Sequence, residues 1–264
     1  MIALLIPQPD DRLLGALVFQ ASKEFKVYVP ADSTAAQDYE GKFPVVQGTL
    51  ESVREPLVCV LEKGAAPGKD FVKKILRTAR RHPEFDVYHV NLEGGKTFPR
   101  KASAAKVFKL TVVEGVSAPL SGFIFRTDKL RARAVLRKDG SLDPIPTVLS
   151  VAKDAPVRNV WRATLPWTAP EEGKGPAQEE ARIREKLDLF RWSETYFGDE
   201  NYPLSVGDQL DLFAAEVAKL YPSYAPENLK EIMMSFQVAQ GTIRKVMASS
   251  ALKSALKARG KQLD

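Results

Sequence analysis

Short apolar segments recur through the first 165 residues, and this feature constrains the fold most. The first runs without a charge from Ile2 to Ile6, as in a strand that is covered on both faces. Between several of the segments lie stretches with the spacing of amphipathic helices. The segments are residues 2–6, 25–29, 45–46, 57–61, 85–90, 122–126 and 157–165. This order predicts an α/β sheet with mostly parallel strands and right-handed crossovers.

Two further patterns belong to the same part of the chain. Residues 71–81 place Phe71, Ile75 and Leu76 on one face and basic residues on the other, which predicts a helix that His82 and Pro83 end. Residues 106–113 alternate between charged and apolar side chains. That alternation predicts a half-exposed edge strand.

A change of composition divides the chain. Residues 168–178 are rich in proline, glycine and charge, which predicts a linker. We therefore expect an α/β domain at residues 1–167 and a helical region at residues 179–264.

Three helices are expected in the helical region. The first covers about residues 179–197, and the second covers about 205–221. Ser205 followed by Asp208 predicts a capped start for the second helix. The third is expected from about residue 226 to 259.

The composition is that of an ordinary globular protein, with 44% hydrophobic and 27% charged residues. Cys59 is the only cysteine, so no internal disulfide can form, and its apolar surroundings predict a buried small side chain. The apolar start of the chain is too short for a signal peptide or a membrane span. We expect a cytoplasmic protein without a transmembrane segment.

Positive charge is concentrated in one stretch of a chain whose net charge is +6. Residues 96–138 contain eleven Lys and Arg, and only Glu114 and Asp128 oppose them. Such a stretch attracts an anionic partner or forms a solvated face. We do not expect nucleic acid, because the interleaved aromatic residues that stack on bases are missing.

Three segments resemble family 2 glycosyltransferases in their order and spacing. Residues 2–7 and the leucine-rich helix after them are similar to the opening of that family. Residues 57–67, followed by a helix and then His82-Pro83-Glu84-Phe85-Asp86-Val87, resemble its central strand and the next strand. Residues 121–130 are similar to the strand and short helix beside its acceptor site. The resemblance covers about residues 1–165 and implies the GT-A fold, a Rossmann-like sheet that binds a nucleotide sugar.

The resemblance places a metal site at the end of the strand at residues 57–61. The family has an Asp-x-Asp motif there, and its two carboxylates hold Mg²⁺ or Mn²⁺ against the donor diphosphate. This chain has Glu62-Lys63-Gly64, so Glu62 is the one remaining candidate metal ligand. Three interpretations stay open: Lys63 contacts phosphate in place of the metal, the site is inactive, or Glu62 and Lys63 are an ordinary surface pair.

The resemblance also implies a general base after the acceptor-site strand, usually in an acidic pair. The corresponding positions here are Ile145, Pro146 and Thr147, which cannot accept a proton usefully. Asp143 is the nearest substitute and Asp139 the next. The alternative is that both are turn residues, because Asp139 precedes glycine and Asp143 precedes proline.

The donor nucleotide is expected at the ends of the first two strands, where open α/β sheets bind ligands. Pro7, Gln8, Asp10 and Asp32 lie there, and Glu62 with Lys63 would complete the binding set. Asp10 has an alternative role as a helix cap, and Asp32 has one in a turn.

Two functions follow. The first is a glycosyltransferase-like protein that takes a nucleotide-sugar donor, either with Mn²⁺ or Mg²⁺ or without a cofactor. The second is a catalytically inactive GT-A-like domain that acts as an interaction or scaffolding module. Its partner, or a second copy of the chain, would bind through residues 179–264, where apolar residues recur at helical spacing.

Overall fold

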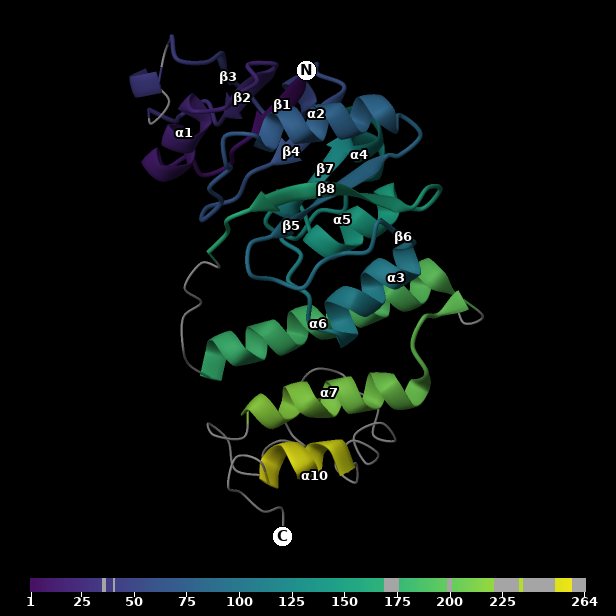
Figure 1. The fold of residues 1–264 in the computed structure, drawn as a ribbon. Coiled ribbons are helices and arrows are strands. Elements are labelled where there is room, and N and C mark those ends of the chain that lie inside the picture. The colour runs from purple at the N-terminus through teal and green to yellow at the C-terminus, as the bar shows by residue number, and fades with distance from the viewer. Residues whose placement is uncertain are drawn as a thin grey trace. The chain divides into compact units, whose positions relative to one another are not determined.

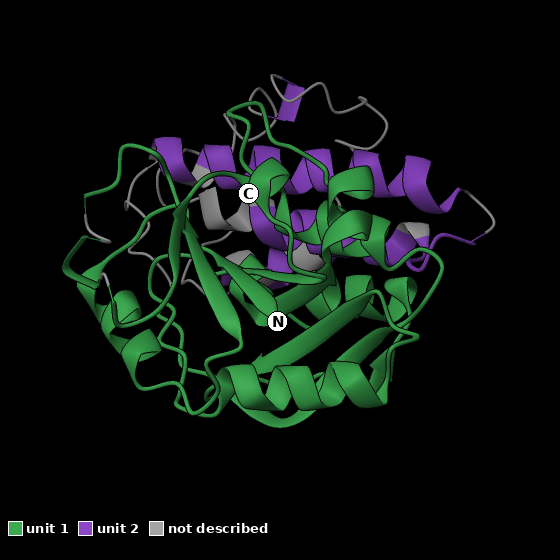
Figure 2. Cartoon of the chain, turned by 90° about the horizontal axis from the view of Figure 1, so that it is seen from above, with its two compact units in different colours: residues 1–170 green, residues 171–264 purple. Residues whose placement is uncertain are grey.

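The computed structural model describes most of the chain, and it divides the chain into two compact units, residues 1–170 and 171–264 (Figure 2). The described residues are 1–34, 37–39, 41–168, 176–198, 201–220, 233–234 and 250–257.

The first unit contains an eight-stranded mixed sheet in the order β3-β2-β1-β4-β7-β5-β8-β6 (Figure 1). β7 is antiparallel to both of its neighbours, and β6 is antiparallel to β8, while the other pairs are parallel. The mixed, mostly parallel sheet that the sequence predicts is confirmed. The strands are β1 (Ile2–Leu5), β2 (Phe25–Val29), β3 (Val45–Gln47), β4 (Leu57–Val60), β5 (Val87–Leu92), β6 (Lys101–Ala102), β7 (Phe123–Arg126) and β8 (Val157–Leu165).

β1 lies where the strand order reverses, because β2 and β3 follow on one side of it and β4 and the later strands lie on the other. It pairs in parallel with β2 on one side and with β4 on the other, in register from Ile2 to Leu5. The chain therefore leaves β1 and β4 at the same edge of the sheet in diverging directions. This is the topological switch point at which α/β sheets form a ligand crevice.

Helices cover both faces of the sheet. The apolar residues of α1 (Asp11–Val18) and α2 (Phe71–Arg81) join one core cluster with alternate residues of β1, β2 and β4. The other helices of this unit are α3 (Ala104–Phe108), α4 (Thr127–Arg133) and α5 (Pro144–Val151), with short 3₁₀ turns at Gln37–Tyr39, Leu50–Ser52 and Leu120–Gly122. Figure 1 shows α2 on one side of β8 and α5 on the other.

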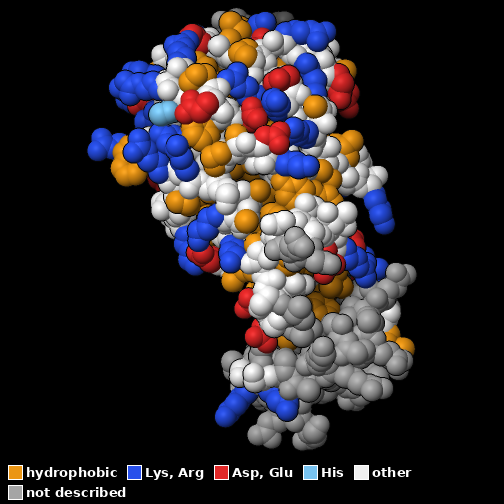
Figure 3. Space-filling model, turned by 90° about the vertical axis from the view of Figure 1, so that its right-hand side faces the viewer, with side chains coloured by type: hydrophobic (Ala, Val, Ile, Leu, Met, Phe, Trp, Pro, Cys, Tyr) orange, Lys and Arg blue, Asp and Glu red, His pale blue; other side chains and the backbone are white. Residues whose placement is uncertain are grey.

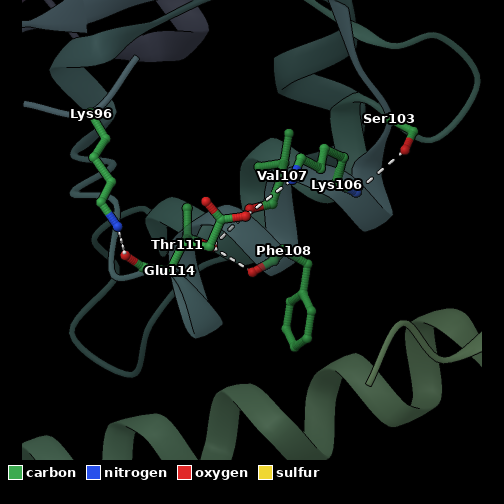
Figure 4. A network of polar contacts seen from close by, with 7 residues as sticks. All are labelled: Lys96, Ser103, Lys106, Val107, Phe108, Thr111 and Glu114. Atoms are coloured by element: carbon green, nitrogen blue, oxygen red, sulfur yellow. Dashed lines mark hydrogen bonds and ion pairs between the residues drawn. The ribbon is translucent and has the colours of Figure 1, made fainter. Parts of the chain in front are cut away.

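The edge strand predicted at residues 106–113 is wrong. Residues 104–108 form α3 and Lys109–Val113 continues it as a π-helix. The Ser103 hydroxyl caps α3 by accepting a hydrogen bond from the Lys106 amide (3.3 Å), and the Thr111 hydroxyl donates to the Val107 carbonyl (3.0 Å; Figure 4). Lys106 and Lys109 are exposed and the residues between them are buried, which resembles the alternation of a strand. The spacing of apolar residues alone therefore could not distinguish a helix from a strand here.

The same segment uses part of its charge internally. Lys106 forms an ion pair with the Glu114 carboxylate (3.0 Å), and Lys96 donates to the Glu114 carbonyl (2.9 Å; Figure 4). Elsewhere in the basic stretch, Arg133 pairs with Asp154 at 2.5 Å and Arg131 donates to backbone carbonyls. Residues 96–138 are therefore not one free cationic surface.

The second unit contains α6 (Pro176–Phe197), α7 (Val206–Leu220) and α10 (Ser250–Lys257). The predicted cap of α7 is confirmed: Ser205 Oγ accepts from the Asp208 amide (3.1 Å), and the Asp208 carboxylate accepts from the Ser205 amide (3.2 Å). α6 and α7 are joined by an ion pair between Lys186 and Glu216 (2.8 Å).

Two expectations for this region fall partly outside the described residues. Residues 169–175 of the expected linker are among those not described, and Pro176 already begins α6, a position that suits proline because it needs no amide donor there. Of the third expected helix, only residues 233–234 and α10 can be compared. No helix within the described part of the chain is long and apolar enough to cross a membrane.

His89 lies fully inside the first unit. Its ring packs between Phe98 and Phe123, with centroid distances of 3.9 and 4.8 Å, and its Nδ1 has no hydrogen-bond partner among the described residues. Burial lowers its pKa from 6.5 to about 3. Burial likewise raises the pKa of the Cys59 thiol, so this cysteine is the inert, buried side chain that the sequence predicts.

We predict that His89 makes the protein acid-sensitive. Because its pKa is lower in the folded state than in the unfolded chain, the unfolded chain binds the proton first. The stability present above about pH 6.5 is therefore lost as the pH falls toward 3, and about 2 kcal/mol of the free energy of unfolding is lost between pH 7 and pH 5. Denaturant unfolding at both pH values measures this loss. In His89→Phe the loss should be smaller by that amount, and an unchanged pH dependence would contradict the assignment.

Candidate functional site: the sheet-edge pocket

A pocket of about 640 Å³ opens at the carboxyl edge of β1 and β4; we call it the sheet-edge pocket. Leu5, Pro7 and Gln8 reach it from the end of β1, and Val60, Glu62 and Lys63 reach it from the end of β4. The other walls come from the turn at residues 49–51, Leu120, the segment from Leu136 to Pro144, and Trp167 after β8. The pocket lies at the switch point that the strand order defines.

The walls suit a ligand with an apolar body and a polar end. Leucine, valine, proline and Trp167 form about half of the lining, while Lys63 and Arg137 supply two cations and Glu51 and Glu62 two carboxylates. The indole Nε1 of Trp167 has no acceptor among the described residues. A volume of this size and an apolar lining with a few polar groups are typical of small-molecule sites.

Glu62 is held by a reciprocal contact with Ser121, which is fully buried. The Ser121 hydroxyl accepts a hydrogen bond from the Glu62 amide at 2.7 Å. The Glu62 carboxylate in turn accepts from the Ser121 amide (3.2 Å) and hydroxyl (3.4 Å). These contacts fix the turn that follows β4 and occupy the Oε2 atom of the carboxylate.

Gly64 occupies the position where the resembling family has its second aspartate. Its φ of +92° lies in the left-handed region, and a Cβ placed there would lie 2.2 Å from the Thr168 carbonyl oxygen. The chain after β8 runs alongside this turn, because the Thr168 amide donates to the Gly64 carbonyl (3.1 Å) and Ala65 pairs with Trp167 in an antiparallel bridge. No side chain fits at residue 64 without a shift of the backbone.

The residues of the pocket do not fit a divalent cation. Mg²⁺ and Mn²⁺ prefer several oxygen ligands, usually carboxylates. Here Glu62 is engaged with Ser121, Gly64 has no side chain, and Lys63 puts a positive charge beside them. Across the described residues, no three His, Cys, Asp or Glu side chains come together as metal ligands.

The two candidate bases do not line the pocket, although their neighbours do. Asp139 is exposed, and hydrogen bonds from the Ser141 hydroxyl (2.6 Å) and amide (2.9 Å) hold its pKa below the ordinary value. A lowered pKa makes a carboxylate a weaker base. Asp143 stands at the N-terminus of α5. The geometry of Asp139 is that of the turn residue considered as the alternative.

The predicted donor-binding residues separate into two groups. Pro7, Gln8, Glu62 and Lys63 line the pocket. Asp10 instead caps α1, its carboxylate accepting from the Leu13 amide at 2.8 Å, and Asp32 is exposed in the loop after β2.

The site predicted from the sequence did not include five polar or aromatic lining residues, Thr49, Glu51, Arg137, Ser141 and Trp167. Glu51 follows β3, and the hydrogen bond from the Thr49 hydroxyl (2.6 Å) lowers its pKa. Trp167 comes two residues after the end of β8, so its place behind a strand was the signal that could have identified it.

Comparison with solved structures assigns the fold. The chain superposes on TarS of S. aureus, residues 1–349 in complex with UDP, with a TM-score of 0.56 and 14% identity, covering 98% of this chain and 87% of that one. A mannosyltransferase of Pyrobaculum calidifontis, PcManGT, in complex with GDP-Man and Mn²⁺, gives a TM-score of 0.52 at 12% identity, covering 96% and 85%. The protein has the GT-A fold, as the sequence resemblance implies.

The similarity covers only part of the longer TarS protein. Against the longer TarS structure the TM-score is 0.52 at 12% identity, and the chain spans only 54% of the length of that protein while 93% of this chain is covered. No protein-family model matches the sequence, and no curated protein matches it.

We predict that an aspartate at residue 64 cannot restore a metal site. Gly64→Asp should lower the free energy of unfolding by at least about 2 kcal/mol, because of left-handed backbone strain and the clash with Thr168. It should also fail to bind Mn²⁺ in a calorimetric titration. Gly68→Asp is the matched control, since a Cβ at residue 68 meets nothing within 4 Å. A stable Gly64→Asp protein that binds Mn²⁺ would refute this account of the turn.

Proposed function

We propose that this protein binds a nucleoside diphosphate, or the sugar conjugate of one, in the sheet-edge pocket and holds it without a divalent cation. It is a glycosyltransferase-like protein whose ligand contacts differ from those of a metal-dependent transferase. The position of the pocket carries the proposal: Leu5, Pro7 and Gln8 after β1 and Glu62 and Lys63 after β4 surround one cavity at the switch point of the sheet.

The chemistry of the walls supports the same ligand. The apolar surfaces of Leu136, Leu142 and Trp167 suit a base and a ribose, while the cations of Lys63 and Arg137 suit the diphosphate. Lys63 stands beside the position that carries the metal ligands in the resembling family. In this proposal its ammonium group takes over the neutralisation of phosphate charge as a point charge.

The neighbouring solved structures support the ligand class. TarS 1–349 was solved with UDP and also with UDP-GlcNAc, the latter at a TM-score of 0.54, and PcManGT was solved with GDP-Man. Because fold alone does not fix function, the proposal rests on the pocket of this chain and uses these ligands only to select the compounds to test.

Sugar transfer needs a base in addition to binding. The carboxylates that line the pocket are Glu51 and Glu62, and both accept hydrogen bonds from neighbouring hydroxyls. We therefore assign the pocket to binding, and we retain Asp143 only as a candidate for the base, next to the lining residue Pro144.

The first test is thermal unfolding of the full chain with UDP, GDP, CDP and dTDP, once in EDTA and once with Mn²⁺. A ligand at about 100 times its Kd adds roughly 2.7 kcal/mol to the free energy of unfolding. We expect one or more nucleotides to raise the Tm, and we expect the rise to be equal in EDTA and in Mn²⁺.

Lys63→Gln should weaken the binding of that nucleotide by about tenfold, because a charge-assisted contact to phosphate is lost. Lys69→Gln removes an exposed charge that does not line the pocket and serves as the control. Binding that needs Mn²⁺ would contradict the cation-free site. If no nucleotide raises the Tm, the proposal fails, and the alternative of an interaction module acting through residues 179–264 is favoured.

A further inference from the structure

A second cavity of the first unit has six cations among its ten described lining residues. It measures about 570 Å³ and lies between α2 and the first half of β8; we call it the basic cleft. It shares no described lining residue with the sheet-edge pocket, and no Asp or Glu is among the residues described as lining it. Its lining residues of positive charge are Lys74, Arg77, Arg81, Arg100, Arg158 and Arg162.

Arg158 is the most informative of these cations because it is buried. The residue is only 5% exposed, and its guanidinium lies 5.6 Å from the centroid of the Phe85 ring. No carboxylate pairs with it in the described part of the structure. Its Nε also has no hydrogen-bond partner there. A buried charge without a counter-charge is costly, so its presence in a cavity wall indicates an anion that binds there.

His82 supports this guanidinium without neutralising it. The Arg158 Nη2 donates to the His82 Nε2 at 2.9 Å, since arginine can only donate. The His82 Nδ1 then carries the ring proton and faces the Glu84 carboxylate at 3.4 Å. The contact orients Arg158 and leaves its positive charge uncompensated. Figure 3 shows Lys and Arg side chains gathered around an exposed histidine, with an acidic side chain beside it.

A large bulge in β8 brings two more groups to the cleft. β5 advances two residues, from His89 to Asn91, while β8 advances five, from Asn159 to Thr164. Val160 and Ala163 stay in the core, whereas Trp161 is 72% exposed. Arg162 within the bulge has a φ of +62°, and its carbonyl accepts from Lys74 Nζ at 2.7 Å. Bulges and left-handed non-glycine residues are concentrated at functional sites, where they redirect side chains.

We propose that the basic cleft binds a small oligophosphate, a ligand with two or more phosphate groups in succession, either free in solution or as the headgroup of a lipid. Five of its six cations are arginines, whose planar forks match phosphate oxygens in pairs. The exposed ring of Trp161 stacks on a ring of the ligand or, for a lipid, rests at the membrane interface. This site is independent of the proposed nucleotide-sugar function.

The residues of the cleft come from three separate segments of the chain. Lys74, Arg77, Thr78 and Arg81 lie on α2 and His82 lies at its end. Arg100 precedes β6, and the remaining four lie on β8. A single cleft with one exposed aromatic residue favours a small ligand over an extended nucleic-acid strand, which needs a series of stacking residues along a groove.

The test is a calorimetric titration of the full chain with inorganic triphosphate in EDTA. Arg77→Gln/Arg162→Gln removes two exposed cations of the cleft and should weaken binding by at least about tenfold. Arg12→Gln/Arg54→Gln removes two exposed arginines that line neither cavity, and it should bind triphosphate as the wild type does. Equal losses in both double variants, or no measurable binding to any phosphate probe, would overturn the proposal.

A second variant tests the buried guanidinium directly. Arg158→Met should lose triphosphate binding without a fall in Tm, because it removes an unpaired buried charge and keeps an apolar body. A purely structural arginine would give the opposite result, a lower Tm with binding intact. If Arg158→Met does not fold, the exposed pair of Arg77 and Arg162 still decides the question.

Two further probes distinguish the source of the phosphate. Binding of inorganic triphosphate or a nucleoside triphosphate supports a free ligand, and Trp161→Ala should weaken only the nucleotide. Sedimentation with vesicles that contain diacylglycerol pyrophosphate, but not with phosphatidylcholine vesicles, supports a headgroup with two successive phosphates if the double cleft variant abolishes it. Single-stranded RNA that binds through the same residues and displaces triphosphate at equal phosphate concentration would overturn the assignment to a small ligand.

Discussion

The parallel pairing of β1 with β2 and with β4 is the constraint on which the rest of the structure depends. It buries the apolar runs of three strands against α1 and α2, and it brings the ends of β1 and β4 to one edge of the sheet. Because the chain leaves these two strands in opposite directions, a space remains between the two exits. The position of the sheet-edge pocket therefore follows from the strand order.

The same edge explains why the turn after β4 folds without the acidic pair of the resembling family. The returning chain after β8 packs its backbone against Gly64, and Ser121 engages the carboxylate of Glu62. Both contacts stabilise the turn after β4 by hydrogen bonds within the protein. Residues that would otherwise hold a cation are thus used for structure, and Lys63 remains as the nearest source of positive charge in that turn.

The sequence predicted the fold where burial decides it. Continuous apolar runs located β1 and β4, the alternation of residues 25–29 located β2, and the spacing of Phe71, Ile75 and Leu76 located α2. It was wrong at residues 106–113, where the cap at Ser103 selects a helix for a pattern that fits either period. Four of the seventeen described lining residues of the pocket were predictable from strand ends, but the contributions of Arg137 and Trp167 depend on loops whose paths are set by tertiary contacts.

Charge density along the chain was a poor guide to charged surfaces in the fold. The basic stretch at residues 96–138 uses several of its cations in contacts with Glu114, Asp154 and backbone carbonyls, whereas the basic cleft collects cations from α2, Arg100 and β8. A cation held in an ion pair and an unpaired guanidinium such as that of Arg158 each add one positive charge to a count along the sequence. Only the second leaves a positive potential for an outside anion, because its charge is not compensated by a neighbouring carboxylate and lies where water screens it least.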